Sequence, residues 1–240
     1  MKDRRTVSIV GIVLVLAVAM FAVVGCGGGE ETGDSEQITI GITQIVEHPA
    51  LDSARQGFID AMADAGYVEG ENVVYDIANA QNDKSNALTI AQKFANDKVD
   101  LIFAIATPTA QAAAQATADI PILITAVTDP VAAGLADSNE APGGNVTGTT
   151  DMNPIAEQIE LIKAFVPDAK KVGVIYNAGE VNSEVQVEIA REVASKIGLE
   201  LVEATVATTA DVNQAAGSLV GRVDAIYIPT DNTVVSALES

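Results

Sequence analysis

Cysteine, histidine, tryptophan and basic residues are scarce in this chain of 240 residues. It has one Cys, one His and no Trp, and aromatic residues make up only 4% of the chain. A lone cysteine cannot form an intrachain disulfide, and a lone histidine excludes a metal site built on two imidazoles. The sequence also contains no Gly-x-Ser-x-Gly elbow, no phosphate-binding loop and no dinucleotide-binding glycine pattern. These absences argue against an enzyme, and we expect neither a metal nor a cofactor.

Basic residues are greatly outnumbered by acidic ones. The chain has 13 Lys+Arg against 33 Asp+Glu, and beyond residue 25 there remain 10 basic and 32 acidic residues, a net charge of −22. Such a surface repels nucleic acid phosphates and anionic lipid headgroups, so we expect neither as a direct partner. Because apolar residues make up 48% of the chain and aromatics are few, we expect an α/β core rich in alanine and valine.

The first 26 residues have the features of a bacterial export signal. Three basic residues in the first five positions precede an apolar stretch at 7–24, which ends in Gly25 and Cys26. The order Val-Val-Gly-Cys at 23–26 resembles the lipobox of bacterial lipoproteins, in which the cysteine takes a diacylglycerol after cleavage. We therefore predict a lipoprotein signal peptide at 1–25 and lipidation of Cys26. An uncleaved membrane anchor is the alternative, since the stretch approaches the length that crosses a ~30 Å hydrocarbon core. Both interpretations place the remainder outside the cytoplasm.

Residues 26–37 are rich in glycine and acidic side chains and show no apolar periodicity. We predict that this segment is a flexible tether between the lipid anchor and the folded part.

From residue 37 onward, strand and helix patterns alternate. Strands are expected at 37–43, 73–77, 101–104, 122–125, 146–149, 172–176, 200–205 and 225–228. Helices are expected at 53–65, 84–96, 183–197 and 211–219, and from Thr107 and Pro154 onward. Thr107 is expected to cap its helix, with Pro108 in the first helical position. This alternation predicts parallel sheets with helices on both faces.

The two halves of this series resemble each other. Lys-Val-Asp-Leu-Ile-Phe-Ala at 98–104 matches Arg-Val-Asp-Ala-Ile-Tyr-Ile at 222–228 with an offset of 124, and Gly41 and Gly173 occupy matching places in the first strands. We predict two similar, doubly wound parallel-sheet lobes, at 38–148 and 149–240, with a ligand cleft between them.

Residues that directly follow the strands are the candidate ligand site, because ligands of open parallel sheets bind beyond the carboxyl ends of the strands. The candidates are Thr43, Gln44, Thr107, Thr109, Thr128, Asp129, Asn177, Glu180, Asp231 and Asn232. The offset aligns Thr107 with Asp231, which predicts that a hydroxyl at a helix start faces a ligand carboxylate while Asp231 faces an ammonium group. A zwitterion would match both.

Several of these residues also have a purely structural interpretation. Thr107 and Asp231 are suited to cap helices, Asp129 precedes a proline as in many turns, and Glu180 stands just before a helix. We interpret His48, in a loop before a proline, as a surface residue.

Five stretches together resemble the ABC transporter substrate-binding family associated with tryptophan and other aromatic or hydrophobic amino acids. They are Ala-Thr-Pro-Thr-Ala-Gln at 106–111, Thr-Asp-Pro-Val-Ala-Ala-Gly-Leu at 128–135, Gly-Gly-Asn-Val-Thr-Gly at 143–148, Val-Ile-Tyr-Asn at 174–177 and Pro-Thr-Asp-Asn-Thr-Val at 229–234. The resemblance implies a type I periplasmic-binding-protein fold with hinge closure, an amino acid ligand, and a partner permease with its cytoplasmic ATPase.

Family members usually continue for several more strands and helices, so we expect the second lobe to be C-terminally truncated here. The function that follows is delivery of a small molecule to a permease by a lipid-anchored protein outside the cytoplasm. The alternatives are an extracellular sensor domain of the same fold, or an α/β enzyme.

Overall fold

The computed structural model describes residues 37–238. The predicted signal peptide, Cys26 and all of the predicted tether except Gln37 lie outside the described residues. Within 37–238, no helix combines the length and the apolar character needed to cross a membrane.

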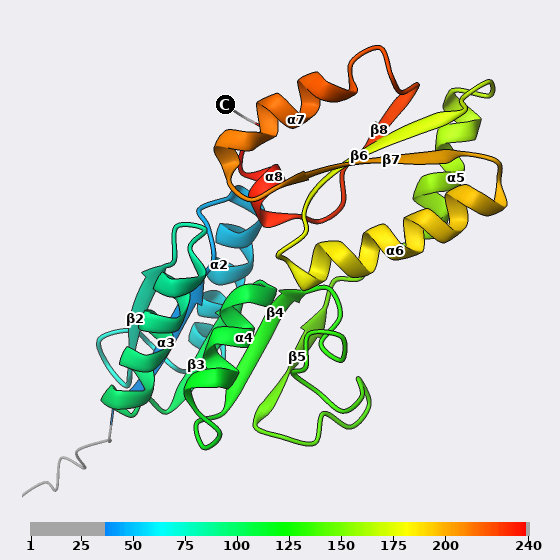
Figure 1. Ribbon diagram of the computed structural model, residues 1–240. Coiled ribbons are helices and arrows are strands. Elements are labelled where there is room, and N and C mark those ends of the chain that lie inside the picture. Colours follow the sequence, from blue (N-terminus) through cyan, green and yellow to red (C-terminus); the bar gives the residue numbers. More distant parts are fainter. Residues whose placement is uncertain (1–36, 239–240) are drawn as a thin grey trace, which may run out of the picture. The chain divides into compact units, whose positions relative to one another are not determined.

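The first lobe is a parallel sheet of five strands in the order β2-β1-β3-β4-β5 (Figure 1). Its strands are β1 (Ile38–Gln44), β2 (Val73–Asn79), β3 (Leu101–Ile105), β4 (Ile122–Val127) and β5 (Val146–Thr150). Its helices are α2 (Pro49–Asp64), α3 (Lys84–Asp97) and α4 (Thr107–Ala116). Side chains alternate across a strand, so β1 turns Ile40 and Ile42 toward α2 and Gly41 toward Phe94 of α3. Both faces of the sheet are thereby covered.

The second lobe repeats this plan around a parallel sheet of three strands, in the order β7-β6-β8. Its strands are β6 (Lys171–Asn177), β7 (Glu200–Val206) and β8 (Ala225–Tyr227). Its helices are α5 (Ile155–Phe165), α6 (Val181–Lys196), a short 3₁₀ turn η1 (Thr209–Asp211), α7 (Val212–Leu219) and α8 (Asn232–Val235). Helices α5 and α6 pack on one face of the sheet, and α7 and α8 on the other.

The predicted internal repeat is confirmed by strand order and by packing. In each lobe, the first strand of the repeat lies between the second and the third. Gly41 at the centre of β1 lies under Phe94 of α3, and Gly173 at the centre of β6 lies under Leu219 of α7. A glycine at each of these places lets the helix after the second strand of the repeat, α3 or α7, approach the sheet closely.

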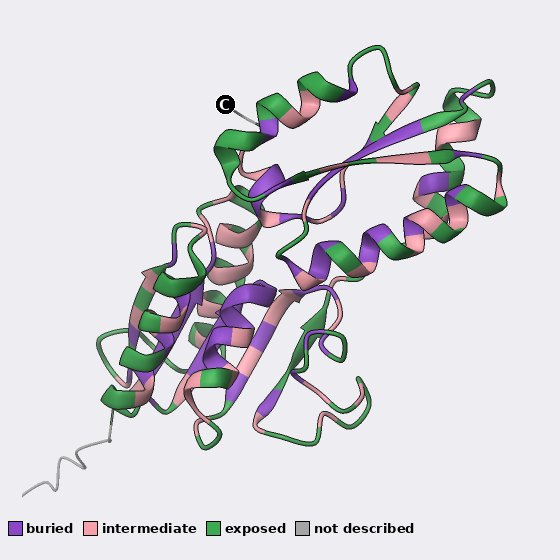
Figure 2. Cartoon of the chain, viewed as in Figure 1, coloured by how far each residue is buried: buried purple, intermediate pink, exposed green. Residues whose placement is uncertain are grey.

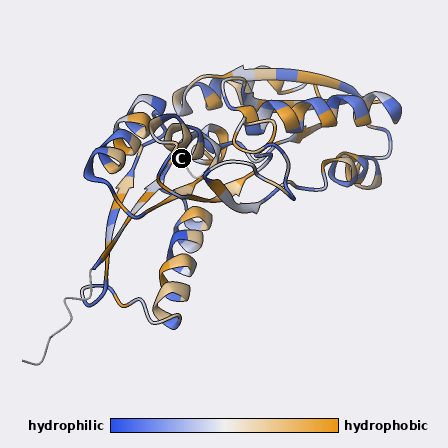
Figure 3. Ribbon diagram, turned by 90° about the horizontal axis from the view of Figure 1, so that it is seen from below, coloured by the Kyte–Doolittle hydropathy of each residue, from blue (hydrophilic) through white to orange (hydrophobic). Residues whose placement is uncertain are grey.

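The buried surface follows the apolar pattern of the strands and the inner faces of the helices (Figure 2). The hydropathy of the same helices changes from apolar to polar around their circumference (Figure 3). The alternating pattern read from the sequence therefore corresponds to sheets buried on both faces.

Three predicted boundaries were wrong. Helix α2 begins at Pro49, four residues before the predicted start, because the ring nitrogen Nδ1 of His48 accepts from the amide of Ala50 and caps the helix. Strand β5 continues in the first sheet to Thr150, beyond the predicted end of the first lobe. Thr107 does not cap α4, since the cap position is Ala106 and Thr107 is already helical.

Candidate functional site

Two alanines at the carboxyl edge of the first sheet have a strained backbone. Ala106 (φ 85°), after β3, and Ala126 (φ 54°), in β4, lie in the left-handed region that non-glycine residues rarely adopt. Such strain costs of order 1–3 kcal/mol per residue and is concentrated at ligand sites. The two neighbouring strands therefore mark this edge as a candidate site.

Three of the predicted site residues in the first lobe are occupied by structural hydrogen bonds. The buried side-chain amide of Gln44 donates to the carbonyl of Val46 and to the carboxylate of Asp52, and its oxygen accepts from the guanidinium of Arg55. The hydroxyl of Thr109 donates to the carbonyls of Ile105 and Ala106. Asp129 accepts from two amides of the following turn, at 3.0 and 2.9 Å. These contacts position the strand ends and support the structural interpretation of Asp129.

Two other predicted residues of this lobe have unused hydroxyl groups. Thr43 is the second-last residue of β1 and Thr107 is the first residue of α4. Both are almost fully buried, and neither Oγ1 has a hydrogen-bond partner. Helix α4 lacks a side-chain cap. Pro108 has no amide hydrogen and the amide of Ala110 donates to the carbonyl of Ala106, so the first turn leaves the amides of Thr107 and Thr109 for a ligand. Because buried polar atoms are usually hydrogen-bonded, these groups form a set of donors available to an anion.

The predicted residues of the second lobe form hydrogen bonds to one another and to their neighbours in the same lobe. Asp231 caps α8 by accepting from the amide of Val234 at 2.7 Å, and it also accepts from the amide of Asn177 and the hydroxyl of Ser183, both at 2.6 Å. Loss of water raises the pKa of Asp231, and the nearby carboxylate of Glu180 raises it further, against the effect of these donors. The capping role of Asp231 is confirmed.

Glu180 forms hydrogen bonds to the two residues that follow Asp231 at the start of α8. Its carboxylate accepts from the amide and side chain of Asn232, and from the amide and hydroxyl of Thr233. Asn177 adds a bond from its side-chain amide to the Thr233 hydroxyl at 2.9 Å. The structure thus brings Asn177, Glu180, Asp231 and Asn232 together as one hydrogen-bonded cluster.

Residues of both lobes line a cavity of about 320 Å³ with mainly apolar walls. The first lobe contributes Val46, His48, Ala50, Leu51, Thr125, Ala126 and Asp151, and the second contributes Thr230, Asp231, Asn232, Val235 and Ser236. Of the ten predicted site residues, only Asp231 and Asn232 line it.

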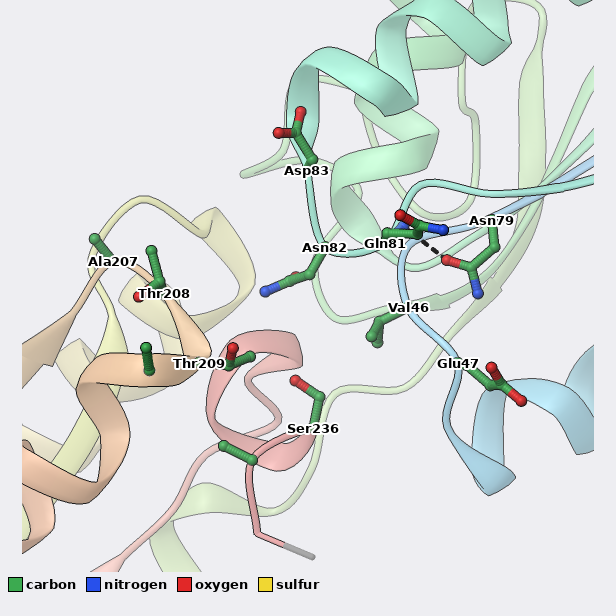
Figure 4. A pocket seen from close by; sticks show the side chains of 12 residues that line it. Val46, Glu47, Asn79, Gln81, Asn82, Asp83, Ala207, Thr208, Thr209 and Ser236 are labelled. Atoms are coloured by element: carbon green, nitrogen blue, oxygen red, sulfur yellow. Dashed lines mark hydrogen bonds between the residues drawn. The ribbon is translucent and has the colours of Figure 1, made fainter. Parts of the chain in front are cut away.

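A wider and more polar cavity of about 780 Å³ adjoins the apolar one, since Val46 and Ser236 line both. Figure 4 shows its walls, which come from the loop after β2 on one side and the loop after β7 on the other. Some of its polar groups are engaged within the protein: Asn79 accepts from the amide of Gln81, and Asp83 caps α3. Unlike the first sheet edge, this cavity offers no buried group without a partner.

Hydrogen bonds also cross directly between the lobes. The side chain of Asn82 donates to the Thr233 hydroxyl at 3.0 Å, and the ammonium of Lys84 donates to the carbonyl of Gly179. The Asn82 side chain extends toward α8 in Figure 4. Thr233 therefore connects the cluster of the second lobe to the first.

Two residues of the apolar cavity were missed or misinterpreted from the sequence. Asp151 directly follows β5, so the strand-end rule would have found it had the strand not been ended too early. His48 was interpreted as a surface residue but lines the cavity and caps α2.

Among residues 37–238, no group of three or more His, Cys, Asp or Glu side chains is placed to hold a metal ion.

Three comparisons with known proteins bear on this site. The family model described as ABC transporter substrate binding protein matches residues 39–240. A curated protein of Clostridioides difficile (strain R20291), named tyrosine-binding protein, is 49% identical over 246 residues, covering 99% of this chain and 70% of that protein.

Two solved structures are similar in different degrees. An ABC domain from Streptococcus pneumonia in complex with L-Trp is 39% identical, with a TM-score of 0.81 over 85% of this chain and 68% of that one. A ligand-free, open substrate-binding protein with adhesive properties from Clostridium difficile is 56% identical, but its TM-score is 0.59 over 83% of this chain and 68% of that one. Because the more identical relative superposes less well, residues 37–238 are arranged more like the tryptophan complex than like the open form.

Proposed function

This chain belongs to the family of ABC transporter substrate-binding proteins, and we propose that it binds one aromatic or large apolar amino acid between its lobes. The apolar cavity carries this proposal. Its volume of about 320 Å³ lies at the small end of the range of ~300–1,000 Å³ for small-molecule sites, which suits a single amino acid. Its mainly apolar wall favours a side chain without charge.

The hydrogen-bond donors of the first lobe suit the carboxylate group of such an amino acid. We assign the ligand carboxylate to the start of α4, where the unpartnered hydroxyls of Thr107 and Thr43 and the amides of Thr107 and Thr109 supply hydrogen bonds. The positive end of the helix dipole adds to this preference for an anion. The tyrosine-binding name of one relative and the L-Trp held by another support an aromatic ligand.

Calorimetric titration of the full-length protein with the natural amino acids and common sugars tests the ligand class. We expect binding of an aromatic or large apolar amino acid, and ligand at 100 times its dissociation constant should add ~2.7 kcal/mol of stability. Val235→Trp should abolish binding by filling the cavity, whereas Val220→Trp, at an exposed position outside it, should leave binding unchanged. Binding of sugars alone would overturn the amino acid assignment.

Delivery and anchoring complete the proposed function. We propose that the ligand passes to an ABC permease driven by a cytoplasmic ATPase, and that a lipid on Cys26 holds the protein at the outer face of a membrane. In cells, labelled palmitate should attach to the protein, and Cys26→Ala should lose both the label and membrane retention. Labelling that survived this substitution would overturn the lipid anchor.

A further inference from the structure

Asp151 is a cavity residue with no structural task that explains its charge. It follows β5, which pairs beside β4, and it lines the apolar cavity together with Thr125 and Ala126 at the end of β4. One of its carboxylate oxygens, Oδ1, is enclosed by protein and has no hydrogen-bond partner. An enclosed carboxylate oxygen without a donor is uncommon, because removing it from water costs free energy and no hydrogen bond offsets that cost.

No cation of the protein compensates this charge. The ion pairs among residues 37–238 do not include Asp151. Loss of water raises the pKa of its carboxyl, and a hydrogen bond with the side chain of Thr128 only partly offsets this effect. Asp151 is thus held in a place where a donor from outside the protein would improve its environment.

The other two acidic groups near the ligand site are already supplied with donors. Asp231 accepts three hydrogen bonds from its own lobe, and Glu180 accepts from Asn182, Asn232 and Thr233. The ammonium role predicted for Asp231 stays a prediction. Asp151 is a competing candidate, because one of its carboxylate oxygens has no hydrogen-bond partner.

The order of the strands sets a distance that fits an amino acid head group. Strands β3 and β5 flank β4, so their ends lie two strand spacings apart, about 10 Å. A head group with one hydrogen bond at each end spans about 8 Å. A carboxylate at Thr107 after β3 and an ammonium at Asp151 after β5 would place the α-carbon over the end of β4. The small side chain of Ala126 leaves room there.

We propose that Asp151 receives the ammonium group of the bound amino acid, an inference that rests on the function proposed above. The first lobe then holds both ends of the head group. The ligand side chain extends into the apolar part of the cavity, toward Leu51 and Val235.

The test compares amino acids with analogues that lack the amino group. Calorimetry on the full-length protein uses L-tyrosine and L-tryptophan against 3-(4-hydroxyphenyl)propionate and indole-3-propionate. The wild type should bind the amino acids at least ~10-fold more tightly than the analogues. Asp151→Asn should remove this preference while leaving the affinity for the analogues unchanged. Asp119→Asn, the same change at an exposed position of the same lobe, should behave as the wild type.

A second measurement separates loss of recognition from loss of folding. Thermal unfolding of ligand-free Asp151→Asn should occur at the same temperature as in the wild type or higher, because the variant removes a charge that has lost its water. If Asp151→Asn keeps the preference for the amino group and Asp231→Asn loses it, the inference is overturned in favour of Asp231. If the wild type binds no amino acid, the proposed function falls, and this inference falls with it.

Discussion

The two lobes have the same strand order but use their polar strand ends in different ways. In the second lobe, Asn177, Glu180, Asp231 and Thr233 bond to one another and close the loop before α8. In the first lobe, the hydroxyls of Thr43 and Thr107 and one oxygen of Asp151 are buried without partners near the strand ends, and the hydroxyl of Tyr75 is a fourth such atom within β2. Among the described residues of the second lobe there is one such atom, Oδ1 of Asn182.

This difference separates polar residues that are hydrogen-bonded within the protein from polar residues that have a group available for the proposed ligand. Hydrogen bonds made within a lobe contribute to its stability, whereas buried groups without partners cost stability until a ligand supplies them. The polar strand ends of the second lobe thus contribute mainly to the stability of that lobe. The other lobe carries the proposed recognition groups.

The largest expected effect contrasts Asp231 with Thr107, which the sequence repeat aligns. Asp231→Ala removes the acceptor for three buried donors and should lower the free energy of unfolding by about 3 kcal/mol. Thr107→Val replaces a buried hydroxyl that has no partner by a methyl group of the same shape, so it should leave this free energy unchanged or raise it. Urea unfolding of the two variants measures both. Equal losses would contradict the proposed division between the lobes.

The matched glycines give the next largest contrast. A Cβ on Gly41 would lie 2.6 Å from the fully buried ring of Phe94, and one on Gly173 would lie 2.8 Å from a terminal methyl of Leu219. Gly41→Ala should cost about 1–3 kcal/mol, and Gly173→Ala less, because a leucine methyl yields more easily than a packed ring. Gly57→Ala, with open space around the new methyl, is the control and should be neutral or stabilising. A larger cost at Gly173 would show that the second lobe is the more tightly packed.

Proton binding to Asp151 should give an effect of smaller amplitude. The pKa of Asp151 is raised in the folded protein above its ordinary value of 3.8, so the folded state binds the proton more strongly than the unfolded state. The contribution of this group to stability is therefore greatest at low pH and falls as the pH rises from about 4 through the raised pKa. The stability advantage of ligand-free Asp151→Asn over the wild type should grow across this range in urea titrations. A bound amino acid should cancel the difference.

The smallest effect concerns the hydrogen bond between the lobes. Asn82→Gly removes the donor to Thr233 and adds no strain, because glycine accepts the left-handed backbone (φ 57°) of this position. We expect a loss of ligand affinity of ~2- to 10-fold by calorimetry, with little change in unfolding free energy. Gln81→Gly, at the neighbouring left-handed position (φ 56°), is the control. An equal loss in both variants would mean that the loop and not the bond is responsible.

Much of the fold could be predicted because its signals are local. Most predicted strands and helices lie within one or two residues of their observed positions, since β-branched runs, helical periods and terminal glycines act over short distances. The start of α2 was missed because a histidine side chain caps it, which is an unusual cap. The cap of α4 was misplaced by one residue because Ala106 takes a strained conformation that composition does not reveal.

Periodicity and order along the chain are enough to predict the alternating elements, the internal repeat and the strand ends where a ligand site is expected. Which polar residues at those ends already have hydrogen-bond partners depends on how the folded chain packs. The partners of Asp231 include Asn177 and Ser183, which are 54 and 48 residues away in the chain, while Asp151 meets none for one of its oxygens. Hydrogen bonding depends on which groups lie close together in the folded protein, and the spacing of residues along the chain does not predict these contacts.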